Sequence, residues 1–453
     1  MAIVPEAVGA DRIKARVAGI MADVPAELGA LVAHPSVAFP GFPPEPVNAA
    51  AQAVADLFTR CGVPGVRLLD LGAGYPTVYA DVPGPEGAPT VLLYAHYDVQ
   101  PAPMEQGWKT DPFTLVEQDG RLIGRGAADD KGGTLAIALS LRAFDGDFPV
   151  GLKIVIEGEE ETLSHLEDFV TANPELFKAD VMVIADMGNI VAGQPAVTST
   201  LRGHVQCTVE TRTVDRPLHS GVFGGAAPDA LVALIRILDG LWDERGNTIV
   251  PGLHSFEWAG PEYPEATFRE LAGMLPGVEI IGDGSVGTKL WSKPNATIIG
   301  LDAPKVAEAG NVLLPTARAK VAMRVAPGAD PEAELATLME FLRARAPWGV
   351  QVDVQRVKAS DPFIVDMDGR AVAAARTALE AAYGVPAGAI GSGGSIPLLE
   401  TLAKASPGAE FVLWGVQDAI ANIHGANESV QLDEIERMTV AQALLLDSLG
   451  QRR

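Results

Sequence analysis

The chain has 453 residues, of which 48% are hydrophobic and 20% are charged. At roughly 100–200 residues per domain this length predicts two or three domains, and the apolar fraction excludes a globally disordered chain. The formal net charge is −24, from 34 lysines and arginines against 58 acids. Because nucleic acids and anionic membranes both attract a positive surface, this charge argues against either as the main partner.

The cysteines and the N-terminal residues also exclude some classes of protein. Cys61 and Cys207 are too few for a disulfide framework, and we expect them to be buried as small apolar residues. Residues 1–10 contain the acidic Glu6 and no basic region before an apolar core, so they do not resemble a signal peptide. No stretch reaches the ~18 apolar residues of a membrane span. We therefore expect a cytoplasmic protein.

Helices and strands alternate in the first part of the chain. Two helices are expected up to residue 61 and another at 132–144. Ser164 and Glu167 have the spacing of a capping box, which predicts a helix that runs to Thr171. Apolar runs of strand length lie at 66–71, 77–81, 90–94, 152–156 and 181–185. This alternation predicts an α/β sheet.

The middle of the chain has a different order of elements. Strands are expected at 205–213, 296–301, 318–326 and 350–357, and helices at 228–241 and 331–345. That order is β-α-β-β-α-β, the ferredoxin-like split, with an insertion at 242–294 that the sequence only partly explains. The α/β pattern resumes after residue 361. We therefore predict that a smaller domain at 200–358 interrupts a larger one formed by 1–199 and 359–453.

Polar side chains follow three strands of the predicted α/β sheet. His96 and Asp98 follow the strand at 90–94, three glutamates at 159–161 follow 152–156, and Asp186 ends 181–185. Because residues i and i+2 of an extended segment face one side, His96 and Asp98 could act together or form a structural pair. Adjacent glutamates repel one another unless a cation or a proton relieves them, although a solvated charge run is the alternative.

Two further segments carry polar groups of the same kind. Asp129 and Asp130 lie in a glycine-rich turn before a helix, where an N-cap explains one acid but not two, and His424 lies in a C-terminal loop. Ligands gather at the carboxyl ends of the strands of such sheets. Mixed imidazole and carboxylate ligands suit Zn, Mn or Co, and five ligands exceed the three of a mononuclear catalytic zinc. We therefore expect two ions.

Six spans, taken in chain order, resemble the carnosinase-like dipeptidases of the di-zinc aminoacylase/carboxypeptidase/dipeptidase family. They are HYDVQP (96–101), GRGAADDKGG (124–133), EGEEE (157–161), LHSGVFGG (218–225), GGSIP (393–397) and NIHGANES (422–429). The resemblance extends from about residue 60 to residue 445. It implies a zinc-peptidase catalytic domain with a mixed sheet flanked by helices, interrupted by an inserted ferredoxin-like lid domain through which the protein dimerises.

The resemblance also implies the roles of particular residues at the metal site. The ligands are His96 and Asp186 for one ion, Glu161 and His424 for the other, and Asp129 between the two ions. Asp98 resembles the residue that orients His96, and Glu160 resembles the general base. The register of the three glutamates depends on aligning residues 162–164 with the usual I-G-S, from which Leu163 departs.

Substrate-binding residues are implied in the smaller domain and in the GGSIP span. His219 resembles a histidine that reaches into the partner subunit's active site to stabilise the oxyanion, and Asn311 lies where a polar group assists it. Arg324 resembles the group that binds the substrate α-carboxylate, with Gly394 and Ser395 nearby. The family often has R-E before GGSIP where this chain has Gly and Ser, which removes a charge pair near the substrate.

These assignments predict a broad dipeptidase. We expect it to hydrolyse dipeptides by a metal-bridging hydroxide, with Glu160 as general base, two divalent ions per subunit, and a homodimer formed through the lid domain. Zn²⁺ is the expected metal, with Mn²⁺ or Co²⁺ as alternatives. A deacylase of N-acyl amino acids or a carboxypeptidase of the same family is the first alternative function, and a catalytically inactive binding or dimerisation module is the second.

Overall fold

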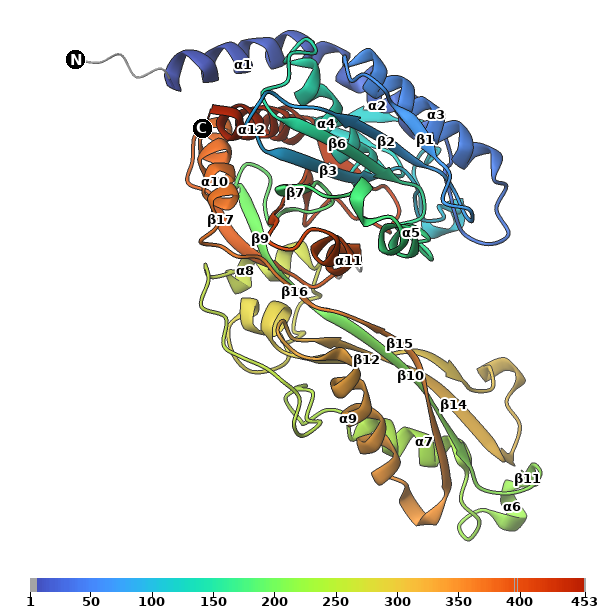
Figure 1. Cartoon of the computed structure of the whole chain (residues 1–453). Coiled ribbons are helices and arrows are strands. Elements are labelled where there is room, and N and C mark those ends of the chain that lie inside the picture. The colour runs from blue at the N-terminus through green and yellow to red at the C-terminus, as the bar shows by residue number, and fades with distance from the viewer. Residues whose placement is uncertain (1–5, 395, 397, 452–453) are drawn as a thin grey trace. The chain divides into compact units, whose positions relative to one another are not determined.

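The computed structural model describes residues 6–394, 396 and 398–451. The chain forms two compact units, whose elements are labelled in Figure 1. Unit 1 comprises residues 1–199, 365–390 and 398–453, and unit 2 comprises residues 200–364 and 391–397. Among the described residues, no helix is long and apolar enough to cross a membrane.

A six-stranded mixed sheet forms the centre of unit 1 (Figure 1). In sheet order its strands are β1 (Arg67–Leu69), β2 (Thr77–Val82), β6 (Gly151–Glu157), β3 (Thr90–His96), β7 (Val181–Ile184) and β18 (Glu410–Leu413). β3 runs parallel to β6 and β7, and β7 runs parallel to β18, whereas β1 and β2 are antiparallel to their neighbours. The expected α/β sheet of mixed direction is confirmed.

Helices pack against this sheet and against one another. They include α1 (Glu6–Ile20), α2 (Val24–Val32), α3 (Glu45–Arg60), α4 (Lys131–Arg142), α5 (Leu166–Ala172), α10 (Arg370–Tyr383), α11 (Leu398–Ala405) and α12 (Leu432–Gln451). α4 contacts β3 and α12, α10 contacts β18 and α12, and α3 contacts β2. Every residue of β6 and β7 is buried, which explains why these strands are continuous apolar runs in the sequence.

The register of the parallel strands determines where their carboxyl ends lie. His96 at the end of β3 pairs with Glu157 at the end of β6, and Tyr94 pairs with Ile184 at the end of β7. The segments that follow these three strands therefore leave the sheet at the same edge. This edge is where ligands bind in open α/β sheets.

The predicted capping box at Ser164 is wrong. The Ser164 hydroxyl donates to the carboxylate of Glu157, and α5 begins at Leu166 with His165 as an N-cap whose side chain makes no capping hydrogen bond to the helix. Glu157 is buried at the end of β6 and also accepts from the Tyr94 hydroxyl at 2.7 Å. A buried carboxylate needs donors, and here it takes the hydroxyl that the capping box would have used.

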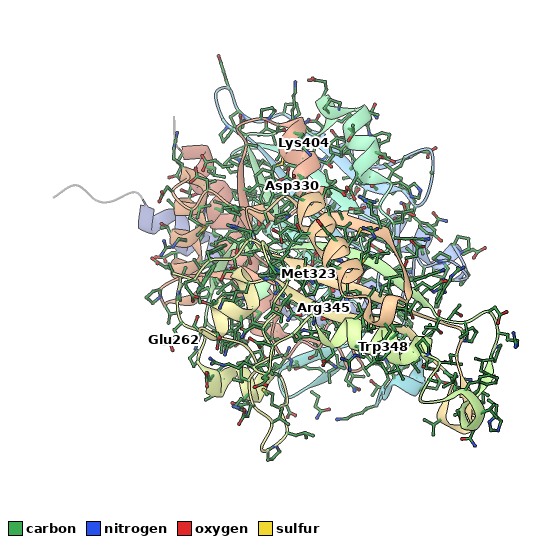
Figure 2. The ribbon with its side chains drawn as sticks, turned by 90° about the horizontal axis from the view of Figure 1, so that it is seen from below. Glu262, Met323, Asp330, Arg345, Trp348 and Lys404 are labelled. Carbon is green, nitrogen blue, oxygen red and sulfur yellow. The ribbon has the colours of Figure 1, made fainter. Side chains whose placement is uncertain are left out.

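Unit 2 contains a four-stranded antiparallel sheet with two helices on one face. In sheet order the strands are β12 (Asn295–Asp302), β14 (Thr316–Val325), β10 (Gly203–Arg212) and β15 (Gln351–Ser360). The helices α7 (Ala230–Asp239) and α9 (Pro331–Ala344) contact β10, with α7 also on β14 and α9 also on β15. Figure 2 shows Asp330 and Arg345 at the two ends of α9.

The two faces of this sheet differ in polarity. Along β10, Val205, Cys207 and Val209 are buried and pack with residues of both helices, whereas His204 and Gln206 are only partly buried on the opposite face. Such alternation is expected for a sheet whose one face is covered. Cys207, like Cys61 in unit 1, is a buried free cysteine as expected.

Candidate metal centre

The first group of candidate ligands surrounds His96 at the end of β3. Its Nε2 lies 3.0 Å from Oδ1 of Asp129 and 3.8 Å from Oδ1 of Asp186. Asp130, which the sequence analysis did not assign to the metal, also offers an oxygen within 4.8 Å of ligand atoms of His96 and Asp186. The amide of Gln417 donates to Asp186 Oδ1 at 3.0 Å and holds that carboxylate in place.

Asp98 lies on the other side of the His96 ring. The Nδ1 atom of His96 is 3.4 Å from Oδ1 of Asp98 and 3.1 Å from the Asp98 carbonyl oxygen. The Asp98 carboxylate also accepts the backbone N–H groups of Glu160 and Glu161, each at 3.1 Å. One buried carboxylate therefore fixes the orientation of His96 and the position of the segment that carries the glutamates.

The second group of candidate ligands surrounds His424. Its Nε2 lies 3.0 Å from Oδ2 of Asp129 and 3.1 Å from Oε2 of Glu161. Gln100 donates to the same oxygen of Glu161 at 2.7 Å. Because Asp129 faces His96 with one oxygen and His424 with the other, its carboxylate joins the two groups.

The three consecutive glutamates point to different partners. Glu159 is buried and binds Nδ1 of His165 at 2.8 Å, whereas Glu161 faces His424. The carboxylate of Glu160 has no hydrogen-bond partner among the described residues. The charges of His96, Glu161 and Asp129 are nonetheless close enough to shift its pKa. Glu160 is thus the glutamate whose carboxylate remains free between the two groups.

Glu428 holds the backbone of the turn that carries Asp129, and the sequence did not single this residue out. It is fully buried, and its two oxygens accept the backbone N–H groups of Gly126, Ala128 and Asp129 at 2.9–3.0 Å. It also pairs with Arg125 Nη1 at 2.7 Å. Glu428 therefore connects the loop of His424 to the turn of Asp129. Its place inside the NIHGANES span was the one available signal.

The electrostatics of the site show an excess of buried negative charge. The carboxylates of Asp98, Asp129, Asp130, Glu160, Glu161 and Asp186 gather around the imidazoles of His96 and His424. Burial raises the pKa of Asp186 well above its usual value, and the charges of Asp129 and Glu160 raise it further against the opposing effect of His96. Burial likewise raises the pKa of Glu160 to about 8, with Glu161 and Asp129 adding to the shift.

The pKa values of the two histidines are also raised, which favours their protonated, positively charged forms. Burial by itself would lower the pKa of His96, but its hydrogen bonds with Asp129 and Asp98 outweigh this and raise the pKa well above the usual value. Hydrogen bonds to Asp129 and Glu161 raise the pKa of His424 to about 10. Two protonated imidazoles cannot balance the charge of six carboxylates, and Oδ1 of the buried Asp130 has no hydrogen-bond partner among the described residues. The donor set fits divalent cations.

The predicted residues of unit 2 lie at two places in that unit. His219 and Asn311 are adjacent, because His219 pairs with Val312 in the short ladder of β11 (Leu218–His219) and β13 (Val312–Leu313). Both side chains are exposed. Arg324 lies on β14, and Gly394 lies in the segment after β17 (Gly388–Ser392). Ser395 lies outside the described residues.

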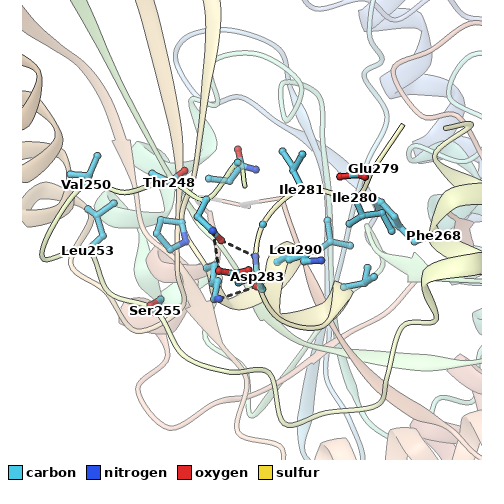
Figure 3. Close-up of a pocket in the computed structure, with 18 of the residues that line it drawn as sticks. Thr248, Val250, Leu253, Ser255, Phe268, Glu279, Ile280, Ile281, Asp283 and Leu290 are labelled. Carbon is cyan, nitrogen blue, oxygen red and sulfur yellow. Dashed lines mark hydrogen bonds between the residues drawn. The ribbon is translucent and has the colours of Figure 1, made fainter. Parts of the chain in front are cut away.

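The cavity shown in Figure 3 belongs to unit 2 and contains none of these predicted residues. It has a volume of about 700 Å³, lies in the segment 246–295, and is lined mainly by apolar side chains such as Val250, Ile281 and Leu290. Asn247 orders its wall by accepting the N–H of Asp283 at 2.8 Å. The cavity therefore contains no residue of the candidate metal centre.

Comparisons with known proteins identify relatives of this chain. The chain is 45% identical over 372 residues to the cysteinylglycine-S-conjugate dipeptidase of Corynebacterium striatum, which covers 80% of this chain and 82% of that protein. It is 30% identical over 348 residues to the Beta-Ala-His dipeptidase of Rattus norvegicus, with 71% and 70% covered. Human carnosine dipeptidase 1 has a similar structure, with a TM-score of 0.84, 25% identity, and 98% and 99% of the two chains covered.

The family itself is shown by a match that spans most of the chain. Residues 92–448 match the peptidase family M20/M25/M40. This span contains both groups of candidate ligands and all of unit 2. The resemblance inferred from the six sequence motifs is thereby confirmed, and the chain belongs to the peptidase family M20/M25/M40.

Proposed function

We propose that this chain is a metal-dependent dipeptidase. The observation that carries the proposal is the position of Asp129, whose two oxygens each lie 3.0 Å from a different histidine, with the free carboxylate of Glu160 close by. Relatives that are named as dipeptidases in bacteria and mammals support the choice of dipeptides as substrates.

The residues that would hold two divalent ions follow from the two ligand groups. His96 and Asp186 would bind one ion, Glu161 and His424 the other, and Asp129 would contact both. Nitrogen and oxygen ligands of this kind fit Zn²⁺ best, with Mn²⁺ and Co²⁺ as alternatives. Such ions, when bound, polarise a carbonyl group and lower the pKa of water.

Two carboxylates of the chain have distinct tasks in the reaction. Asp98 accepts Nδ1–H of His96 on its backbone carbonyl oxygen, with its carboxylate 3.4 Å away, and so presents Nε2 to the metal. A carbonyl or carboxylate behind a ligating histidine usually has this role. Glu160 takes a proton from the attacking water on its carboxylate and passes it to the departing amine. This general acid–base role typically contributes 10²–10⁴-fold to the rate.

Glu160→Gln tests this assignment of the general base. The change removes the proton acceptor but keeps the size of the side chain, so we expect kcat to fall by about 10²–10⁴-fold while the bound metal content stays unchanged. Rates on a panel of dipeptides and on the matching N-acetyl amino acids distinguish a dipeptidase from a deacylase. If the metal-loaded parent enzyme hydrolyses neither class, the proposal is wrong.

We also propose that the protein acts as a homodimer in which His219 of each subunit, assisted by Asn311, stabilises the oxyanion in the other subunit's site. The exposed side chains of both residues support an intermolecular role. The strand β12 supports dimerisation, since it forms an edge of its sheet and exposes Ile298, Ile299 and Leu301. Exposed apolar edge strands favour pairing with another chain. Arg324 binds the α-carboxylate of the substrate, and Gly394 is expected to lie near it.

Subunit mixing tests the shared site. The Glu160→Ala and His219→Ala chains should each be inactive alone. Both sites of a Glu160→Ala dimer lack the general base, and both sites of a His219→Ala dimer lack the partner's histidine. Mixed dimers contain one site with both groups intact, so activity should return after subunit exchange. An absence of activity despite exchange measured by labelled subunits contradicts the shared site.

A further inference from the structure

Arg202 is a buried cation whose charge the described residues of unit 2 do not neutralise. It lies between β9 (Ala196–Leu201) and β10 and is 8% exposed. Its Nε is buried with no hydrogen-bond partner, and its Nη1 donates only a long bond of 3.5 Å to the carbonyl of Lys293. Buried guanidinium groups are normally paired, because an isolated buried charge is costly.

Arg324 is close to Arg202 and also makes no ion pair with the described residues. Burial, together with the charge of Arg324, lowers the pKa of Arg202 to about 10. On the sheet, Arg324 lies opposite His204 of β10 and Asn295 of β12. Neither of these paired residues brings an acid to the guanidinium group of Arg324.

Other cations extend the positive charge on the same face. Burial and the charges of Arg324, Lys358 and Lys320 together lower the pKa of His204 to about 4. This local excess of cations stands out in a chain whose net charge is −24. A site of this kind attracts anions.

The segment 391–394 approaches Arg202 without neutralising it. The backbone N–H of Arg202 donates to the carbonyl of Ser392 at 3.2 Å. At Gly393, a Cβ atom would lie 2.9 Å from Nη2 of Arg202, so only a glycine leaves the guanidinium unobstructed there. The Ser392 side chain is uncharged, and its hydroxyl is engaged by the N–H of Gly394 at 3.1 Å.

We infer that Arg202 binds a second carboxylate on the substrate, so that the enzyme prefers dipeptides whose C-terminal residue is Asp or Glu. The inference rests on the proposed function, in which Arg324 binds the α-carboxylate. The two carboxylates of a C-terminal Asp or Glu are only a few covalent bonds apart, which suits two neighbouring guanidinium groups in one unit. Arginine favours such contacts because its planar fork matches a carboxylate.

A comparison of isosteric substrates tests the inference. We expect kcat/KM of the metal-loaded enzyme for Ala-Glu to exceed that for Ala-Gln by about tenfold or more, since hydrogen bonds to charged groups are the stronger kind. Arg202→Met should reduce this ratio to near one, mainly through KM, and Arg202→Lys should restore part of it. Arg318→Gln is the matched control, because it removes an exposed cation that is paired with Asp302 on the same sheet. The control should leave the ratio unchanged.

Equilibrium binding provides a second measurement that leaves Arg202 intact. The slow variant Glu160→Gln should bind Ala-Glu about tenfold more tightly than Ala-Gln in calorimetry, and this result decides the matter if Arg202→Met does not fold. Equal values for the two dipeptides, or a ratio that Arg202→Met leaves unchanged, overturn the inference. Hydrolysis of Ala-Gln and Ala-Gly without a preference for Ala-Glu overturns the inference alone, whereas no hydrolysis of any dipeptide overturns the proposed function.

Discussion

Glu428 provides the sharpest prediction about how the fold holds the metal centre. Its two oxygens receive four donors: the N–H groups of Ala128 and Asp129 on Oε1, and the N–H of Gly126 and the guanidinium of Arg125 on Oε2. Glu428→Gln replaces one oxygen with an NH₂ group, so two donors must face another donor whichever way the amide is turned. The usual conservative substitution is therefore expected to be severe here.

The magnitude follows from burial. Arg125 and Glu428 are 1% and 0% exposed, and breaking a buried pair on one side costs about 3–5 kcal/mol. At about 2 °C per kcal/mol for a domain of this size, the thermal midpoint of unit 1 should fall by roughly 6–10 °C. Because Glu428 holds the N–H of Asp129, metal affinity should fall by roughly 10–100-fold, as for other groups that orient metal ligands.

Two measurements on the full-length protein check this prediction. Thermal unfolding gives the change in midpoint, and competition with a chelator gives the change in metal affinity. Glu27→Gln is the matched control, because it breaks a partly buried ion pair with Arg142 in the same unit without touching the site. A Glu428→Gln protein with the parent's midpoint and the parent's metal affinity would refute the reasoning.

Three further outcomes are expected. Removal of metal should abolish hydrolysis. The metal-free protein should lose stability as pH rises from 4.5 toward 8, because the pKa of Glu160 is raised from 4.5 to about 8 and the folded state binds this proton more tightly than the unfolded state. In thermal unfolding, the metal-loaded protein should lack this pH dependence. The pKa of His204 is about 4 in the folded protein and 6.5 in the unfolded chain, so the protein should lose stability as pH falls from 6.5 to 4. His204→Gln should remove that part of the pH profile. NMR titration of the ring gives its pKa directly, and a value near 6.5 contradicts the prediction. Ile299→Lys places a charge on the exposed edge strand β12 and should shift this protein from dimer to monomer in sedimentation. Val306→Lys, at an exposed position outside the strand, should not change the oligomeric state.

The sequence by itself determined which segments carry the chemistry. The apolar runs that became β3, β6 and β7 are continuous because both faces of the sheet are covered, and this pattern is visible without a structure. The polar residues that follow these runs had to leave the sheet at one edge, since parallel strands end together. His96, the glutamates at 159–161 and Asp186 could therefore be grouped before any coordinates were known.

Only the tertiary structure shows which partner each of the neighbouring acids contacts. Glu159, Glu160 and Glu161 are identical in type and adjacent in the chain, and they differ only in whether they meet His165, no partner or His424. The capping box predicted at Ser164 is absent because the Ser164 hydroxyl donates instead to the buried carboxylate of Glu157 at the end of β6. Glu428 and Arg202 are the clearest examples. The sequence gives the identity of each charged side chain, but its burial and its partners determine its free energy. These depend on segments that lie far apart in the chain.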